Sequence, residues 1–255
     1  MDPRSVAVAI GAIGAAYLIG AIPWGVVIAR VVGGPDPRTM GSGRTGGANV
    51  MRALGPRVAV VAGVLDLLKG CVAVAIPELL GADILVVGLC ALAAIIGHSR
   101  SIYIGFRGGR GVSPAFGALL VLWPVVALVI IPIFFVIVRF THYSSLGSLI
   151  ASALAGGVLV VLILVQGLPP AHLVYAIGGP ALIWLFHWDN IQRLLTGRER
   201  TIDSRGARAT AGTDAGTGGG SAAGGSGGSA AGGSAAGTAG GSAAGTVGGS
   251  GSRPA

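Results

Sequence analysis

The first 190 residues consist of long apolar blocks separated by short polar stretches that are rich in glycine and arginine. A bilayer-spanning helix needs about 20 mostly apolar residues, so each block is a candidate span. The pattern predicts seven spans, at Val6–Val32, Pro56–Pro77, Ile84–Gly97, Val112–Trp123, Pro124–Phe140, Ser145–Val165 and Ala171–His187. We therefore expect an all-α, polytopic integral membrane protein with about seven transmembrane helices.

The number of spans depends on the apolar run Val112–Phe140, which is too long for one ordinary span. Its Trp123-Pro124 pair predicts a break, because proline lacks a backbone N–H and restricts the residue before it. A single long, tilted helix over this run would give six spans instead. The first block is too long for the core of a signal peptide, and it ends at Arg30 rather than at a cleavage site of small residues, so we interpret it as a span.

The composition changes after about Asp203, where glycine, alanine, serine and threonine replace almost all large apolar residues. Such a segment cannot bury enough apolar surface to offset the entropy of ordering its backbone. We therefore divide the chain into a transmembrane domain, 1–203, and a disordered tail, 204–255. A role of the tail as a spacer or tether stays open.

The chain is 53% hydrophobic and only 10% charged, and its formal net charge is +8. Soluble domains usually contain about 25% charged residues, so an ordinary soluble protein is excluded. A basic balance is also typical of nucleic-acid-binding proteins, but these arginines flank apolar blocks, which favours a membrane explanation. With the N-terminus outside, nearly all basic residues lie on the cytoplasmic side. An odd number of spans then places the basic tail there as well.

Asp66 and Lys69 lie deep inside a predicted span, in the stretch LDLLKG, and their spacing places them on one helix face. Charges inside a membrane generally face protein, water or one another. A structural ion pair and snorkelling of Lys69 to the interface are both open, besides a role of Lys69 in the active site. Cys71 and Cys90 also lie in apolar blocks and are not spaced as a metal-binding pair, so we expect no metal there.

Three polar clusters follow the ends of apolar blocks, and the predicted spans place all three on one membrane face. They are GSGRTGGANVMRALG at 41–55, GHSRSIYIGFRGGRGVS at 97–113 and HWDNIQRLLTGRER at 187–200. Glycine lets the backbone approach an anion closely, and arginine offers permanently charged, planar donors suited to phosphate. One such loop alone could be a solvated turn, but three on one face predict a phosphate-binding site. None of them is a nucleotide-binding fingerprint.

The chemistry of this site is narrowed by what the sequence lacks. Many acyltransferases pair a histidine with an aspartate five residues later, but the residues at that spacing here are Tyr103, Gly147, Ile177 and Gln192. The paired aspartate motifs of membrane CDP-alcohol phosphotransferases are missing too. An acyl donor with a good leaving group needs less help from the protein, and an acyl phosphate suits both this lack and the cationic loops.

The clusters and the blocks beside them resemble the bacterial acyl-phosphate:glycerol-3-phosphate acyltransferases of the PlsY family. The first cluster is similar to the family's GSGN-x-GATN-x-x-R loop, and the second to its loop with a histidine followed by FKGGKGV. The resemblance extends from about Tyr17 to Glu199 and is carried in order by YLIGAIPWGVVIAR, GSGRTGGANVMRALG, LDLLKG, GHSRSIYIGFRGGRGV, HYSSLGSL and HWDNIQRLLTGRE. Motifs in this order, on the predicted sides of the predicted spans, make the resemblance specific.

The resemblance implies an enzyme of the bacterial inner membrane that moves a fatty acyl group from acyl phosphate to the 1-position of glycerol 3-phosphate. The products would be phosphate and lysophosphatidic acid for phospholipid synthesis. It implies no metal, no acyl-CoA and no other cofactor, and a site at the cytoplasmic face. The implied partners are the two substrates and membrane lipid, without nucleic acid.

Individual residues carry over by matching position. The resemblance implies catalytic roles for Ser42, Asn49, Arg110, His187 and Asn190. It implies substrate binding by Arg52, Gly108, Gly109, Gly111, Ser145 and Lys69, with the glycines letting the backbone approach the anion. It also implies that the phosphate of the substrate helps to accept the proton.

The chain departs from the family's pattern in its anion-binding loops. Arg44 replaces an asparagine, Gly47-Ala48 an Ala-Thr pair, Arg110 a lysine, Ser113-Pro114 an Ala-Thr pair and Ser101 a proline. A divergent acyltransferase with another phosphorylated acceptor is therefore an open alternative. A transporter or channel for a phosphorylated solute is another. A non-catalytic scaffold for anionic lipid would leave the serine, asparagine and histidine of the motifs unexplained.

Overall fold

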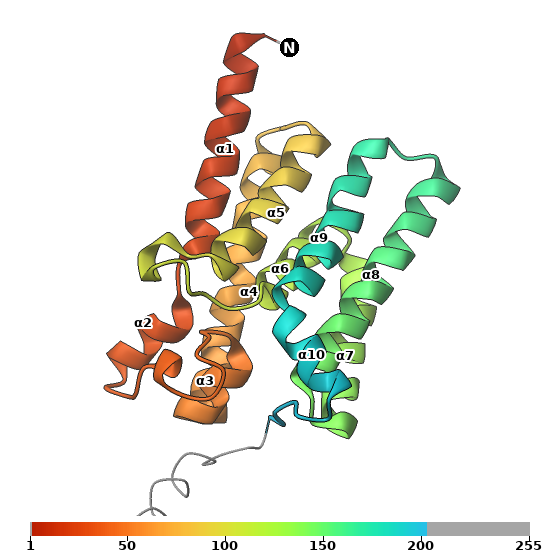
Figure 1. The fold of residues 1–255 in the computed structure, drawn as a ribbon. Helices are drawn as coiled ribbons and strands as arrows, with labels where there is room; N and C mark the ends of the chain where they lie inside the picture. The colour runs from red at the N-terminus through yellow and green to blue at the C-terminus, as the bar shows by residue number, and fades with distance from the viewer. Residues whose placement is uncertain (1, 203–255) are drawn as a thin grey trace, which may run out of the picture. The chain divides into compact units, whose positions relative to one another are not determined.

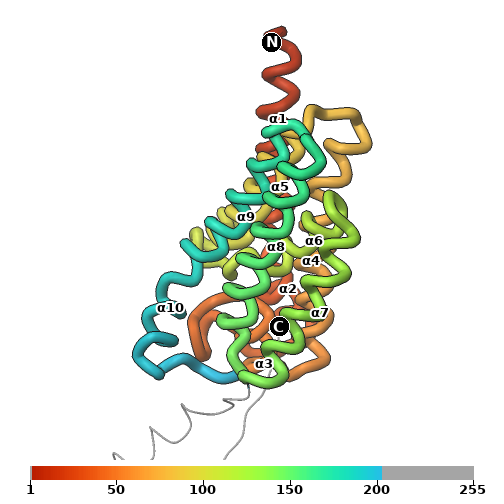
Figure 2. Tube along the Cα trace, turned by 90° about the vertical axis from the view of Figure 1, so that its right-hand side faces the viewer, coloured from red at the N-terminus to blue at the C-terminus, as the bar shows by residue number. Residues whose placement is uncertain are grey.

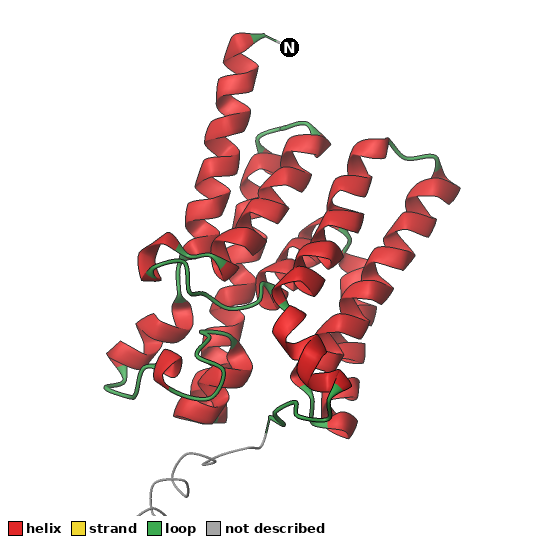
Figure 3. Ribbon diagram, in the orientation of Figure 1, coloured by secondary structure: helices red, strands yellow, loops and turns green. Residues whose placement is uncertain are grey.

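The computed structural model describes residues 2–202, which belong to the first of two units of the chain, Met1–Ala209. The predicted tail at 204–255 lies outside the described residues. The described part is helical and contains no strand, as predicted (Figure 3). Its α-helices are α1 Pro3–Ala21, α2 Trp24–Val31, α3 Gly47–Leu54, α4 Pro56–Leu79, α5 Ile84–Ser99, α6 Val112–Leu122, α7 Pro124–Thr141, α8 Ser144–Gln166, α9 Leu173–Phe186 and α10 Trp188–Leu195. Short 3-10 helices lie at η1 Pro37–Thr39, η2 Ile102–Ile104 and η3 Pro170–His172.

The break predicted inside the run Val112–Phe140 is confirmed. Helix α6 ends at Leu122 and α7 begins at Pro124, and Trp123 between them has non-helical backbone angles, φ −142° and ψ 66°. The alternative of one long helix over this run is therefore wrong.

The prediction of one continuous span over Val6–Val32 is also wrong. Helix α1 ends at Ala21, and α2 begins at Trp24 after a break at Ile22 and Pro23. Proline has no N–H for a helical bond and pushes the preceding residue toward extended angles, and Ile22 has φ −57° and ψ 117°. Only α1 of this block is therefore a candidate span, and α2 starts a separate helical segment.

Helices long and apolar enough to cross a bilayer are α1, α4, the segment Ile84–Ile104, α7 and α8. Two shorter apolar helical segments, Val112–Leu122 and Pro170–Phe186, occupy the remaining predicted positions. Many large apolar side chains on these helices are exposed, including Val60, Val129, Phe135 and Leu164. Apolar faces of this kind are stable when the surrounding solvent is lipid, so the fold is that of a multi-pass membrane protein.

Small residues allow the central helices to approach one another closely. A Cβ built on Gly20 of α1 would overlap the backbone of Ala94 in α5. A Cβ on Gly117 of α6 would likewise overlap the carbonyl of Leu67 in α4. Close helix packing through small residues is the usual means of association in membranes, where lipid tails are as apolar as leucine. These contacts join α1 to α5 and α6 to α4. Helices α4, α5 and α6 carry or adjoin many of the polar residues described below.

Helices α2, α3 and α10 lie at the end of the described bundle that is far from the start of α1 (Figures 1 and 2). The first polar cluster contributes α3 and the third contributes α10, whereas α2 comes from the first apolar block. The two clusters are more than 130 residues apart in the sequence, and their meeting at one end of the bundle confirms that they share a face.

Candidate functional site

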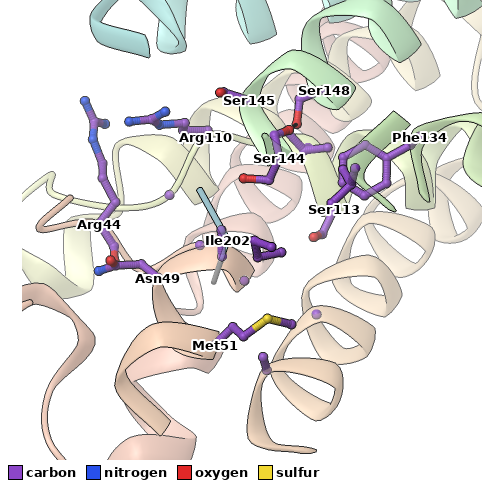
Figure 4. A pocket seen from close by; sticks show the side chains of 18 of the residues that line it. Arg44, Asn49, Met51, Arg110, Ser113, Phe134, Ser144, Ser145, Ser148 and Ile202 are labelled. Atoms are coloured by element: carbon purple, nitrogen blue, oxygen red, sulfur yellow. Dashed lines mark hydrogen bonds between the residues drawn. The ribbon is translucent and has the colours of Figure 1, made fainter. Parts of the chain in front are cut away.

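The polar clusters line one large cavity, whose volume is about 880 Å³ (Figure 4). Its walls come from α3, α4, the end of α5, α6, α7, α8 and α10, from the loops before α3 and α6, and from the segment at 199–202. The polar lining includes Ser42, Arg44, Asn49, Arg52, His98, Arg110, Ser113, Arg139, His142, Ser144, Ser145, Ser148, Asn190, Arg193, Glu199 and Arg200. The apolar lining includes Val60, Val64, Leu67, Phe116, Ile131, Phe134, Phe135 and Val138. The cavity therefore suits a ligand that is anionic at one end and apolar at the other.

The lining carries a large excess of positive charge. Its described residues include Arg44, Arg52, Arg110, Arg139, Arg193 and Arg200, and Glu199 is the one carboxylate among them. The first residues of α3, α6 and α8 also line it, and none of these helices has a side-chain N-cap bond. Uncapped helix N-termini offer free N–H groups and the positive end of the helix dipole. Arginines and three helix ends thus create a site for more than one negative charge.

Asn49 organises the first polar loop and is 2% exposed. Its side-chain amide donates to the carbonyl oxygens of Pro37, Met40 and Arg44, at 2.5, 3.1 and 2.8 Å. Its Oδ1 accepts a hydrogen bond from the backbone N–H of Ser42 at 3.1 Å. Because backbone groups occupy the whole amide, Asn49 acts by holding Ser42 and Arg44 at the cavity wall, a role that the sequence did not reveal.

Arg52 lines the cavity, but its guanidinium group binds protein. It donates to the carbonyl oxygen of Thr201 through Nη2 at 2.9 Å and through Nε at 3.3 Å. The backbone N–H of Ile202 donates to the carbonyl of His142 at 2.9 Å, and Ile202 itself lines the cavity. These hydrogen bonds hold residues 201–202 against the cavity. Burial, and then the charge of Arg200, lowers the pKa of Arg52.

Glu199 joins residues of α8 and α10. Its Oε1 accepts hydrogen bonds from Ser145 Oγ at 2.9 Å and from Asn190 Nδ2 at 2.5 Å. Its Oε2 accepts from Arg193 Nε at 2.8 Å. Glu199 was not among the predicted site residues. The sequence signal for Glu199 was its position as the single acidic residue between two arginines, in the stretch GRER.

Asn190 has one atom that the protein leaves unpaired. Its Oδ1 is buried and has no hydrogen-bond partner among the described residues, although Nδ2 is bound to Glu199. A buried carbonyl oxygen without a donor is unfavourable by about 1–3 kcal/mol. Asn190 lines the cavity, but this oxygen is itself covered, so a ligand hydroxyl group can supply the missing donor only after the side chain or its neighbours move.

Arg110 projects from the loop before α6 and donates to Asp189 Oδ2 at 2.9 Å. Arg193 donates to the same oxygen at 3.2 Å, so one carboxylate serves two guanidinium groups. Burial lowers the pKa of Arg110 to about 10, which leaves it charged at neutral pH. Burial would raise the pKa of Asp189, but Arg110 and Arg193 hold it below its ordinary value.

The glycines of the GGRG loop pack against His98. The N–H of Gly108 donates to the Ser99 carbonyl at 3.2 Å and that of Gly109 to the His98 carbonyl at 3.0 Å. A Cβ on Gly108 would overlap the His98 carbonyl oxygen, and a Cβ on Gly109 would overlap His98 Nε2. Gly109 lines the cavity, whereas Gly108 and Gly111 do not. The close approach that these glycines permit is therefore to His98, and Gly111 adds a left-handed turn, φ +81°, before α6.

Lys69 lies outside the cavity lining and is only 4% exposed, so it does not snorkel. Its ammonium forms an ion pair with Asp66 at 2.7 Å. It also donates to the Ile22 carbonyl at 2.7 Å and contacts His98 Nδ1 at 2.9 Å. The ammonium group therefore contacts a carboxylate, a backbone carbonyl and an imidazole at once. Of the alternatives left open by the sequence, the structural ion pair with Asp66 is present, and His98 connects it to the cavity wall.

His187 is buried behind the cavity lining rather than in it. Its Nδ1 contacts the Ile183 carbonyl at 2.8 Å, which fixes the tautomer protonated at Nδ1. Burial and then the charge of Arg110 lower the pKa of His187 from 6.5 to about 4, so the ring is neutral at pH 7. His187 therefore supports α10 and Arg110 as an uncharged group.

We expect this shift to appear in the stability of the protein. Between pH 6.5 and 4 the unfolded chain binds the His187 proton and the folded chain does not, so stability falls as the pH falls through this range. The full contribution is about 3 kcal/mol. This loss of stability is measured as the change in unfolding temperature in detergent between pH 7 and pH 5. The wild type is compared with His187→Asn, whose amide N–H can still donate to the Ile183 carbonyl. A fall in unfolding temperature of the same size in both proteins would contradict the assignment.

Within residues 2–202, no group of three or more histidine, cysteine, aspartate or glutamate side chains could hold a metal ion. Of the predicted site residues, Ser42, Asn49, Arg52, Gly109, Arg110, Ser145 and Asn190 line the cavity. Those that lie behind or beside the lining are Lys69, Gly108, Gly111 and His187.

Comparisons with known proteins agree on one family. The family model described as glycerol-3-phosphate acyltransferase matches residues 10–197. The chain is 40% identical over 191 residues to the glycerol-3-phosphate acyltransferase of Thermus thermophilus, which covers 74% of this chain and 93% of that protein. It is 39% identical over 191 residues to the glycerol-3-phosphate acyltransferase of Dechloromonas aromatica, covering 75% of this chain and 94% of that protein.

Solved structures give the same result. The fold is similar to the crystal structure of PlsY, an integral membrane glycerol 3-phosphate acyltransferase, in its glycerol 3-phosphate form, with a TM-score of 0.69 and 39% identity. The lysophosphatidic acid form of PlsY is similar with a TM-score of 0.67 and 38% identity. Each match covers 76% of this chain and 94% of the other.

Proposed function

Because this chain belongs to the glycerol-3-phosphate acyltransferase family, we propose that it transfers a fatty acyl group from acyl phosphate to the 1-position of glycerol 3-phosphate. The protein is a membrane glycerol-3-phosphate acyltransferase that forms lysophosphatidic acid.

One observation carries the choice of donor. A single cavity joins an end rich in arginine to a wall of valine, leucine, isoleucine and phenylalanine side chains. An acyl phosphate has a dianionic head and a long apolar tail, so it matches both parts of the lining. Glycerol 3-phosphate is small and dianionic, and it needs only the arginine-rich end.

The proposed reaction needs little from the protein beyond charge and position. The 1-hydroxyl oxygen of glycerol 3-phosphate attacks the acyl carbonyl carbon, and the bond from that carbon to the phosphate oxygen breaks. The hydroxyl proton passes to the departing phosphate, which leaves as hydrogen phosphate. The arginines neutralise the two phosphate groups, which would otherwise repel one another, and position the reactants.

Asn190 and Ser42 are suited to orient the acceptor. The Oδ1 of Asn190 has no donor among the described residues, and a small movement of the side chain toward the cavity would let it accept a hydrogen bond from a glycerol hydroxyl group. Ser42 lies in the loop that Asn49 holds at the cavity wall, and its hydroxyl can bind a phosphate oxygen. Glu199 positions Asn190 and Ser145 by accepting hydrogen bonds from both.

The proposal includes the placement of the site in the cell. The arginine-rich clusters indicate that it faces the cytoplasm, with the N-terminus outside and the segment after residue 203 on the cytoplasmic side. The membrane is then the inner membrane of a bacterial cell, where both soluble glycerol 3-phosphate and a lipid product can reach the site.

We expect Gly63→Leu to shift the donor preference toward shorter chains. Gly63 lies in the apolar wall, and a Cβ built there meets no atom within 4 Å, so the new side chain points into free space. The ratio of kcat/KM for lauroyl phosphate to that for palmitoyl phosphate should rise about tenfold or more, since each buried CH₂ contributes about 0.8 kcal/mol. The matched control is Gly157→Leu, on an exposed face of α8 that is also free of close contacts. An unchanged ratio in Gly63→Leu would place the acyl chain elsewhere.

The donor is tested with purified protein, labelled glycerol 3-phosphate and either palmitoyl phosphate or palmitoyl-CoA. We expect labelled lysophosphatidic acid to form with palmitoyl phosphate only, and its formation with palmitoyl-CoA alone would contradict the proposal.

The transporter alternative is tested with labelled glycerol 3-phosphate in proteoliposomes. Entry of the label without formation of lysophosphatidic acid would favour it.

A further inference from the structure

Arg44 is a cation that forms no ion pair with any carboxylate in the described part of the chain. It lines the cavity and has no hydrogen bond or ion pair with a carboxylate among the described residues. Its position is nevertheless fixed, because its carbonyl oxygen accepts a hydrogen bond from the buried Asn49 amide at 2.8 Å. An arginine whose backbone is held at the cavity wall, and whose side chain has no carboxylate partner among the described residues, is suited to bind an anion from outside the protein.

The guanidinium groups of Arg44 and Arg110 lie near one another at the same side of the cavity (Figure 4). The carboxylate nearest to them, Asp189, is already shared between Arg110 and Arg193. Two like charges at partly buried positions repel more strongly than in water. Asp189 also interacts with the charge of Arg44, but one carboxylate cannot balance three guanidinium groups, so this part of the cavity favours a further anion.

We propose that Arg44 and Arg110 form a two-armed clamp for one phosphate dianion, with Arg44 as an arm that determines how tightly this protein holds its phosphorylated ligand. The inference rests on the proposed function for the identity of the ligand. The phosphate belongs either to acyl phosphate or to glycerol 3-phosphate. Two planar guanidinium groups can together donate up to four hydrogen bonds to the oxygens of one phosphate. A lysine or an asparagine at position 44 or 110 lacks this planar pair of donors.

The clamp is tested first by binding, without turnover. Titration calorimetry with inorganic phosphate is carried out on detergent-purified wild type, Arg44→Gln, Arg44→Lys and Arg107→Gln. We expect Arg44→Gln to weaken phosphate binding by about 10- to 100-fold, since a hydrogen bond to a charged group contributes about 1.5–3 kcal/mol. Arg44→Lys should weaken it less, because it keeps the charge and loses only the fork.

Arg107→Gln is the matched control. It removes one positive charge three residues from Arg110, but Arg107 is exposed and lies outside the cavity lining. We expect its phosphate affinity to stay within about twofold of the wild type, because exposed charges are strongly screened. Equal weakening in Arg107→Gln and Arg44→Gln would show a general charge effect and overturn the clamp. Unchanged affinity in Arg44→Gln would overturn it as well.

Steady-state kinetics then identify the substrate whose phosphate is held. A raised KM for palmitoyl phosphate in Arg44→Gln assigns the clamp to the donor, and a raised KM for glycerol 3-phosphate assigns it to the acceptor. If both KM values match those of the wild type, the clamp is overturned for the reaction. If the wild type itself does not use palmitoyl phosphate, the proposed donor is wrong, and the phosphate titration still decides the clamp.

Discussion

Arg110→Gln is expected to lower kcat/KM by about a thousandfold while the protein still inserts into the membrane. Removing one charged donor that stabilises the anion of the reaction costs about a hundred- to a thousandfold in rate. The Arg110 side chain is 13% exposed, and it contributes to the anion end of the cavity from a loop held against His98. Asp189 keeps Arg193 as a partner after the change, so folding should suffer much less than turnover.

This prediction is measured as kcat/KM for both substrates, together with unfolding temperature and elution volume in detergent. Arg107→Gln again serves as the control for a charge lost nearby but outside the cavity. Near-normal turnover in a well-folded Arg110→Gln protein would remove Arg110 from the site. A loss of turnover that only follows a loss of folded protein would assign it a structural role.

Gly108→Ala and Gly109→Ala are expected to reduce activity by about a hundredfold or more and to lower the unfolding temperature. The added Cβ overlaps the His98 carbonyl oxygen in the first case and the tip of the His98 ring in the second. Backbone cannot move aside as a side chain can, so Gly108→Ala should be the more damaging change. Displacement of this loop also moves Arg110, and small misplacements of a positioning group can cost about a hundredfold in rate.

A second substitution separates these two clashes. In a His98→Ala background, the unfolding temperature lost through Gly109→Ala should be largely regained, because the overlapping ring is absent. That lost through Gly108→Ala should not be regained, because the carbonyl remains. Strictly additive effects of Gly109→Ala and His98→Ala would show that the two residues do not interact and would contradict the packing account.

Local sequence rules predicted the helices well where the cause was local. The Trp123-Pro124 break follows from the chemistry of proline alone, and the structure confirms it. The same chemistry operates at Pro23, yet the uninterrupted apolar character of the first block hid the break there. Hydropathy reports that a segment is apolar, and it does not report where a helix ends.

The site was predicted in part, because residue type and position reveal charge but not hydrogen-bond partners. The arginine-rich clusters could be assigned to one face from the order of the spans. The roles of Asn49 and Glu199 could not, since their partners lie up to 12 and 54 residues away in the sequence and come together only on folding. The contact between Lys69 and His98 joins α4 to α5, so residue spacing along the sequence could not predict it either.

The most direct test of the account is the release of inorganic phosphate by purified protein supplied with palmitoyl phosphate, with and without glycerol 3-phosphate. We expect one phosphate released for each lysophosphatidic acid formed, little release without the acceptor, and loss of both products in Arg110→Gln. Phosphate release that is equally fast without glycerol 3-phosphate, or lysophosphatidic acid formed without phosphate release, would contradict acyl transfer from acyl phosphate in this cavity.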